Sequence, residues 1–303
     1  MKKVTMKDIA IRADVSLATV SYVLNNNEKE KINDETKEKI FKIAKELNYV
    51  PNLNARSLVN KKSGLIGVIV VRDYKTEGPW KKNFYSSYIN TLERLLNKQG
   101  YHLLITNVPS DKPNLNIILQ RELEAVFVID VDEKFFYKIS NNFTVPIIIL
   151  DSIIEDNLFY KILPNFQYTI NKALEDINDK EAYLITEKFN STKVMDSIIN
   201  TFNKKKHNLY IMESKEGIKN FLKTRKDNKG IVISEYVALL AERYVDYKNL
   251  TVISTCGDSY FLPEDINLLE FNILNKAEKS VELMKELLEQ KYRGNRYLIL
   301  QAE

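Results

Sequence analysis

The stretch "VTMKDIAIRADVSLATVSYVLN", residues 4–25, decides how the first part of this chain folds. Its apolar residues begin with the i, i+3, i+4, i+7 spacing of one helical face, at Met6, Ile9, Ala10 and Ala13. Thr5 stands just before them, where a hydroxyl caps the free N–H groups of a helix start. The first half of the stretch therefore predicts a short capped helix.

The second half of the stretch predicts a turn and another short helix. Residues 14–16, "DVS", interrupt the apolar stripe with a turn-tolerant Asp14, and Ser16 is suited to cap the second helix. In that helix Val20, Val23 and Leu24 point inward. The residues left outside are Leu17, Ala18, Ser21 and Tyr22.

A third helix is expected after the polar segment "NNNEKEK". Asn33 caps "DETKEKIFKIAKELNY", residues 34–49, whose apolar face holds Ile40, Ile43, Ala44 and Leu47. Two short helices joined by about three residues and braced by a third are typical of a helix-turn-helix. A three-helix protein-interaction domain is the alternative at this point.

The positive charge of the chain is concentrated at its beginning. Residues 1–62 hold 13 Lys and Arg against 8 Asp and Glu, whereas the remainder holds 32 against 33. This distribution favours a small module that faces a polyanion, joined to a neutral body. Chance unevenness among solvated faces is the other interpretation.

Composition limits the chemistry that the chain can perform. With one cysteine and two histidines among 303 residues, it forms no intramolecular disulfide and makes a dedicated zinc site improbable. No dinucleotide-binding, Walker-type or nucleophile-elbow motif occurs, and His102, His207 and Cys256 are interpreted as structural or solvated. We expect no enzyme, no cofactor and no metal. The absence of a signal peptide and of any run of 18 apolar residues predicts a cytoplasmic protein that is not in the membrane.

Residues 63–303 predict an α/β body. Apolar runs of four to eight residues without alternation, such as "GLIGVIVV", "AVFVID" and "VPIIIL", are typical of parallel strands covered on both faces. Helical segments alternate with them, which favours a doubly wound sheet. The pattern restarts near Asn165, so two similar subdomains are expected, with chain crossings near 163, near 273 and close to the C-terminal strand. A ligand would lie in the cleft at the carboxyl ends of the strands.

The opening stretch, together with "ELNYVPNLNARSL" at residues 46–58, closely resembles the lactose repressor (LacI/GalR) family of bacterial transcription regulators. The resemblance implies an all-α helix-turn-helix domain and a body of two doubly wound subdomains that is similar to periplasmic sugar-binding proteins. The expected domains are a DNA-binding domain at 1–49, a hinge at 50–62 and a body at 63–303. Its subdomains would be about 63–163 plus 274–303, and 164–273.

The resemblance also implies which residues meet double-stranded operator DNA. Leu17, Ala18 and Tyr22 would read base edges, and Tyr22 departs from the Arg or His that relatives often carry. Backbone contacts are implied for Thr5, Ser16, Thr19, Ser21, Asn25, Tyr49 and Asn52. In the hinge, Ala55, Arg56 and Leu58 would lie in the minor groove of the operator centre, with Leu58 as a wedge between base pairs. The alternative is that Leu58 packs against the body.

The effector site is where this chain departs from its relatives. Asp151 matches a sugar-binding Asp, and Trp80, Ser234, Glu235, Asp258 and Asn272 fall near the expected ligand positions. The family's arginine, however, is replaced by Ile198, which removes a fork for paired hydroxyls. Three alternatives stay open: a sugar-like ligand of carbohydrate metabolism, another small ligand, or no small ligand, with control by a protein partner or by abundance.

The expected function is a homodimeric, sequence-specific transcription regulator, with repression as the expected mode and an association with the nucleoid when bound to DNA. A stand-alone solute-binding protein and a non-specific architectural protein are the alternatives. The intact helix-turn-helix argues against the first, and the large α/β body argues against the second.

Overall fold

The computed structural model describes residues 4–24, 31–47, 49, 62–75, 77, 84–177, 181–202 and 208–303. The chain divides into two compact units, Met1–Ser63 and Gly64–Glu303.

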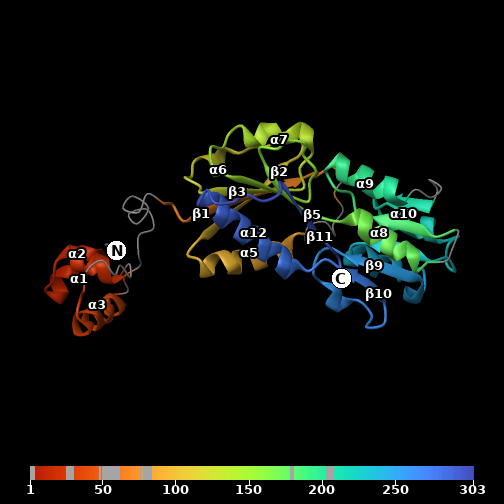
Figure 1. Cartoon of the computed structure of the whole chain (residues 1–303). Helices are drawn as coiled ribbons and strands as arrows, with labels where there is room; N and C mark the ends of the chain where they lie inside the picture. The colour runs from red at the N-terminus through yellow and green to blue at the C-terminus, as the bar shows by residue number, and fades with distance from the viewer. Residues whose placement is uncertain are drawn as a thin grey trace. The chain divides into compact units, whose positions relative to one another are not determined.

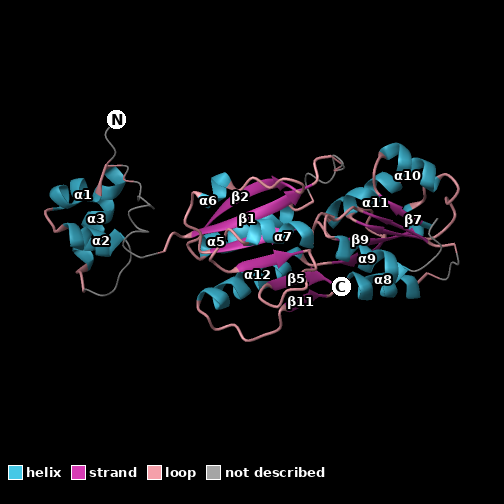
Figure 2. Cartoon of the chain, turned by 90° about the horizontal axis from the view of Figure 1, so that it is seen from above, coloured by secondary structure: helices cyan, strands magenta, loops and turns pink. Residues whose placement is uncertain are grey.

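The first unit consists, in its described residues, of three helices: α1 (Met6–Ala13), α2 (Leu17–Leu24) and α3 (Asp34–Glu46) (Figure 2). Their apolar faces meet in one buried cluster, which contains Ile9, Ala10, Ala13, Val20, Val23, Ile40 and Ile43. The helices begin where the sequence predicts, because Thr5 caps α1 and the Asn33 side chain accepts from the Thr36 amide. The predicted helix-turn-helix arrangement is present.

The second unit contains two separate parallel sheets (Figure 2). The first sheet has the order β11-β5-β4-β3-β1-β2, and every pairing in it is parallel. Its strands are β1 (Leu65–Arg72), β2 (His102–Pro109), β3 (Ala125–Ile129), β4 (Ile147–Leu150), β5 (Tyr160–Pro164) and β11 (Tyr297–Leu300).

Helices cover both faces of this sheet (Figure 1). On one face, α5 (Ser86–Lys98) and α12 (Ile273–Leu288) pack against Ile66, Val68 and Val70. On the other, α6 (Asn116–Leu119) and α7 (Glu133–Ser140) pack against Ile69 and Val71. Both faces of β1 are therefore apolar, which explains its uninterrupted hydrophobic run.

The second sheet has the order β10-β9-β8-β6-β7 and is also entirely parallel. Its strands are β6 (Tyr183–Thr186), β7 (Leu209–Ile211), β8 (Gly230–Ile233), β9 (Leu250–Ser254) and β10 (Asn267–Glu270). Helices α8 (Phe166–Glu175) and α9 (Thr192–Phe202) cover one face. Helices α10 (Lys215–Leu222) and α11 (Glu235–Ala241) cover the other. Two short 3-10 turns, Tyr247–Asn249 and Ser259–Phe261, flank β9.

The chain passes between the two sheets three times. It crosses between β5 and α8, returns between β10 and α12, and leaves β11 for a final backbone pairing of Glu303 with Glu270. The predicted fold class, a helix-turn-helix domain with a two-subdomain α/β body, is confirmed.

Two strands escape prediction from the sequence. β5 contains the buried Lys161, whose ammonium donates to the Phe159 carbonyl at 3.0 Å, so its apolar run is broken by a charge. β10 is only four residues long and partly exposed. β2 departs in another way: it is an edge strand with several exposed positions rather than a strand covered on both faces.

Candidate DNA-binding and effector sites

Local hydrogen bonds set the first helix and the turn after it. The Thr5 hydroxyl accepts from the Asp8 amide at 3.4 Å, and the Asp8 carboxylate accepts from the Thr5 amide at 2.8 Å. This reciprocal pair is a capping box. At the other end Asp14 adopts a left-handed conformation, φ 56°, which Asp tolerates and which turns the chain toward α2.

The start of α2 is capped from within. The Ser16 hydroxyl accepts from the Thr19 amide at 3.0 Å and lies 2.8 Å from the Thr19 hydroxyl. Leu17 and Ala18, the first two residues of the helix, are exposed, whereas Val20 and Val23 are buried. The helix thus presents its N-terminal residues outward on a capped, fixed backbone.

The predicted DNA-binding residues fall into three groups. Thr5, Ser16, Leu17 and Ala18 are exposed; Thr19, Ser21, Tyr22 and Tyr49 are half-buried. Tyr49 packs against the cluster of the first unit, and its amide donates to the Ala44 carbonyl at 2.9 Å. The others lie outside the described residues: Asn25, Asn52, Ala55, Arg56 and Leu58.

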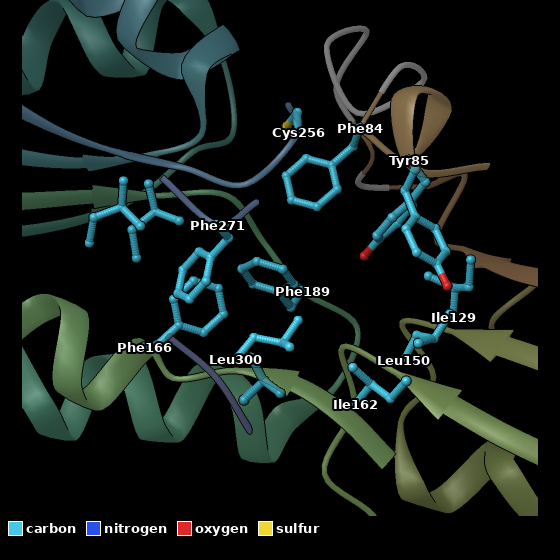
Figure 3. Packing of buried hydrophobic residues seen from close by; sticks show 14 of the residues in the cluster. Phe84, Tyr85, Ile129, Leu150, Ile162, Phe166, Phe189, Cys256, Phe271 and Leu300 are labelled. Carbon is cyan, nitrogen blue, oxygen red and sulfur yellow. The ribbon is translucent and has the colours of Figure 1, made fainter. Parts of the chain in front are cut away.

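The cleft between the two sheets is filled by aromatic side chains (Figure 3). Ring centroids lie 5.7 Å apart for Phe84 and Phe189, 5.4 Å for Phe166 and Phe189, and 5.7 Å for Phe166 and Phe271. The space left among these rings, Asp151 and Lys276 is about 20 Å³. That volume holds about one water molecule, whereas pockets for small ligands are on the order of 300 Å³ or more.

Asp151, predicted to match the family's sugar-binding Asp, has a partner within the chain. The Lys276 ammonium donates to both of its carboxylate oxygens, at 2.7 and 2.6 Å, and both side chains are buried. The same ammonium lies 5.0 Å from the ring centre of Tyr88. A ligand hydroxyl would have to displace this ion pair to reach Asp151.

Glu235 is also engaged, by the loop after β9. Its carboxylate accepts from the Ser254 hydroxyl at 2.6 Å and from the backbone amides of residues 255–258 at 2.9 to 3.2 Å. Glu235 and the preceding Ser234 are fully buried. The Ser254 hydroxyl at the end of β9 and the four amides after it thus share this carboxylate, so it shapes the loop.

The remaining predicted effector residues are placed differently from one another. The Asp258 carboxylate accepts from the hydroxyls of Ser87, at 3.0 Å, and Tyr236. Asn272 is exposed and caps α12 by accepting from the Asn275 amide at 2.9 Å. Ile198, predicted to stand in place of the family's arginine, is fully buried in the core. Trp80 lies outside the described residues.

A polar seam joins the two subdomains beside the aromatic cluster. The Asn190 amide donates to the Asp130 carboxylate at 2.7 Å, and its side chain donates to the carbonyls of Val71 and Asp130. The Asp132 carboxylate accepts from the amide and the hydroxyl of Thr192 at 3.1 and 2.8 Å. The two subdomains therefore contact each other directly through polar groups as well as rings.

A larger hollow, about 520 Å³, adjoins this seam, since Asn190 and Thr192 are among its lining residues. It is lined by residues of the β6–α9 loop, the start of α9 and the end of β7, with Lys75 across from them. Lys75 and Lys188 are ion-paired with Asp111 and Asp73, at 2.6 and 3.2 Å. None of the described residues predicted to hold an effector lines this hollow.

Sequence patterns alone do not single out Lys276 or the four phenylalanines. The sequence nevertheless contains a feature that could have pointed to Lys276 and one that could have pointed to three of these phenylalanines. Lys276, Ser280 and Met284 occupy one buried face of α12, so a lysine stands on an apolar stripe. Phe166, Phe189 and Phe271 each come one to three residues after a strand, where a ligand site would usually place polar groups.

Within the described residues, no helix combines the length and the apolar character that a bilayer crossing requires. The same part of the chain contains no group of three or more His, Cys, Asp or Glu side chains arranged to hold a metal ion.

Comparison with known proteins agrees with this architecture. Residues 5–52 match the family model described as "Bacterial regulatory proteins, lacI family". The transcriptional regulator MalR of Streptococcus pneumoniae is 38% identical over 117 residues, which are 39% of this chain and 34% of that protein. The ribose operon repressor of Haemophilus influenzae is 31% identical over 151 residues, 48% of this chain and 43% of that protein. The chain thus matches less than half the length of these relatives.

The fold of the whole chain is that of the lac repressor. The lac repressor dimer bound to operator and the anti-inducer ONPF superposes with a TM-score of 0.75 at 18% identity, covering 99% of this chain and 98% of that one. A helix-turn-helix unit with a two-sheet α/β body defines the class. Residues 5–52 of this chain, which contain the helix-turn-helix, match the lacI family of bacterial regulatory proteins.

Proposed function

We propose that this protein is a sequence-specific DNA-binding transcription regulator that acts as a repressor. Two copies would read a pseudo-palindromic operator, with α2 of each copy in a major groove. The observation that carries the proposal is the capped helix-turn-helix, whose exposed α2 start lies inside the match to the lacI model. The named relatives are transcriptional regulators, which also argues against an enzyme.

The proposed contacts derive from this placement. Leu17, Ala18 and Tyr22 meet base edges, and Thr5, Ser16, Thr19, Ser21, Asn25, Tyr49 and Asn52 meet the backbone. Residues 50–62 form a hinge in which Leu58 wedges between base pairs of the minor groove, beside Ala55 and Arg56. The family model matches up to residue 52, so the first part of this hinge lies inside the match.

Selection from a random duplex library tests the proposal. The full chain is expected to enrich two inverted half-sites whose spacing is set by its two-fold symmetry. A library that stays random after repeated rounds at fixed salt would contradict sequence-specific regulation, because only backbone contacts then remain.

We further propose that the cleft takes no sugar-like effector. The aromatic cluster and the Asp151–Lys276 pair occupy the place where a ligand would lie, and only about 20 Å³ remains there. Control by a protein partner or by abundance is then the favoured alternative. Of the residues predicted for an effector, Asp258 links the two subdomains through Ser87, whereas Asp151 and Glu235 bond within their own subdomains.

Thermal-shift measurements on the full chain examine this second point. Sugars, sugar phosphates and nucleobases are expected to leave the melting temperature unchanged, since only a bound ligand stabilises the folded state. A dose-dependent rise with any of them would refute the closed cleft. Repeating that titration with Glu213→Ala, which alters only the wall of the hollow beside the seam, would show which of the two cavities holds the compound.

A further inference from the structure

The outward end of α2 begins with two side chains that carry no hydrogen-bonding atom. Leu17 and Ala18 are its first two residues, and 52% of the Leu17 surface is exposed. In a helix-turn-helix, the N-terminal residues of the second helix are the ones that face base edges. An apolar surface therefore stands where sequence is read.

The hydroxyls beside these two residues are already engaged with the helix start. Ser16 accepts from the Thr19 amide at 3.0 Å, and the two hydroxyls are 2.8 Å apart. The pair retains one hydroxyl proton, which suits a phosphate oxygen better than a base because both residues flank the helix N-terminus. Base contact at this end of α2 is left to Leu17 and Ala18.

One feature of the major groove is apolar. Thymine carries a C5-methyl group there, whereas the other base edges present hydrogen-bond donors and acceptors. Ala18 shares its helical face with Tyr22 one turn later, and Leu17 shares its face with Ser21. Leu17 and Ala18 thus lie side by side on two adjacent stripes and would contact different base pairs.

We propose that Leu17 and Ala18 read thymine methyl groups, so that each half-site contains two T·A pairs recognised through their methyls. This inference rests on the proposed DNA-binding function and specifies what that function recognises. Tyr22 adds an aromatic edge and a single hydroxyl next to the Ala18 contact.

The test replaces individual thymines by deoxyuridine in a duplex enriched by the full chain. Deoxyuridine lacks only the methyl and keeps every hydrogen-bonding group. At two positions per half-site, each single substitution should lower the affinity about fourfold, which is the effect expected for burying one methyl. Replacing the same T·A pair by 5-methylcytosine·G should bind about fourfold tighter than cytosine·G.

Variants of the protein assign the contact. Leu17→Ala should remove the thymine preference at one of the two positions and leave the other. Ile11→Ala is the matched control, since Ile11 is an aliphatic residue on α1 that is 72% exposed; it should retain both preferences. Both side chains are exposed, so both variants should melt near the temperature of the unaltered chain.

The outcomes separate this inference from the function on which it rests. An enriched duplex that binds equally well with deoxyuridine at every half-site thymine overturns methyl reading but leaves specific regulation intact. Enriched half-sites that contain no thymine would also overturn methyl reading and leave specific regulation intact. A library that yields no enriched sequence contradicts the proposed function itself.

Discussion

At the scale of single residues, the Asp151–Lys276 ion pair is the most informative contact of the body. It joins the residue that directly follows β4 to the buried face of α12, 125 residues later in the chain. Asp151 has a left-handed backbone, φ 54°, a conformation that Asp and Asn tolerate. The residue that matches a ligand-binding Asp thus has its charge compensated inside the protein.

Breaking this pair should be costly. Asp151→Asn keeps the size and the backbone conformation but leaves the Lys276 ammonium buried without its counter-charge, so we expect a loss of about 3–5 kcal/mol in the free energy of unfolding by urea. Adding Lys276→Met should recover much of that loss, because no charge then remains buried. Equal midpoints for the single variant and the unaltered chain would show that the pair is not formed in solution.

The residue scale also shows how far sequence-based prediction reaches. The predicted caps Thr5, Ser16 and Asn33 are confirmed, because each bonds to an amide three residues away. The sequence identifies the position of Asp151 but not its partner, since nothing local to the sequence connects two residues so far apart. Phe189 and Phe84 escape prediction for the same reason: their meeting depends on how the two sheets are brought together.

At the scale of elements, hydrogen bonds from Thr192 at the start of α9 to Asp132, the N-cap of α7, link the two subdomains. Burial works to raise the pKa of Asp132, but hydrogen bonds from the Thr192 hydroxyl and amide and from the Lys134 amide outweigh it and lower that pKa. The Lys193 ammonium, 2.6 Å away, lowers the pKa of Glu133. Both carboxylates are therefore held in the charged form across the seam.

This seam should weaken in acid. Because the folded-state pKa of Asp132 lies below its ordinary value of 3.8, the stabilisation is complete above that pH and is lost as the pH falls through the lower folded-state pKa. Asp132→Asn should destabilise the chain at neutral pH and flatten its stability profile below pH 3.8, as followed by urea unfolding at several pH values. Parallel stability-versus-pH profiles for Asp132→Asn and the unaltered chain would mean that Asp132 does not contribute to the loss of stability in acid.

The proposed hinge, residues 50–62, is the second element on which the proposed function depends. Leu58 lies outside the described residues, and its role as a wedge stays a prediction. Leu58→Ala should weaken binding to the enriched duplex and reduce its bending, measured by gel mobility of circularly permuted fragments, because the apolar group that unstacks the central step is removed. Leu53→Ala, in the same segment, is the control; unchanged bending by Leu58→Ala would favour packing against the body.

At the scale of the whole molecule, the protein combines a helix-turn-helix unit that matches the lacI family model with a body whose inter-subdomain cleft is filled by its own side chains. The alternation of apolar runs and helices predicts the body's class, because parallel strands covered on both faces have a distinctive pattern. The sequence does not predict β5, because a buried lysine interrupts its apolar run, nor β10, because its run is short and half-exposed. The contents of the cleft depend on both sheets together, and no local pattern describes them.

The central claim is sequence-specific DNA recognition by the first unit, and a direct titration tests it. The affinity of the full chain is measured for the enriched duplex and for a scrambled duplex of the same composition, at one physiological salt concentration. The claim predicts binding at least about 1,000-fold tighter to the enriched duplex, the lower range for specific regulators. Equal affinities for the two duplexes would contradict it.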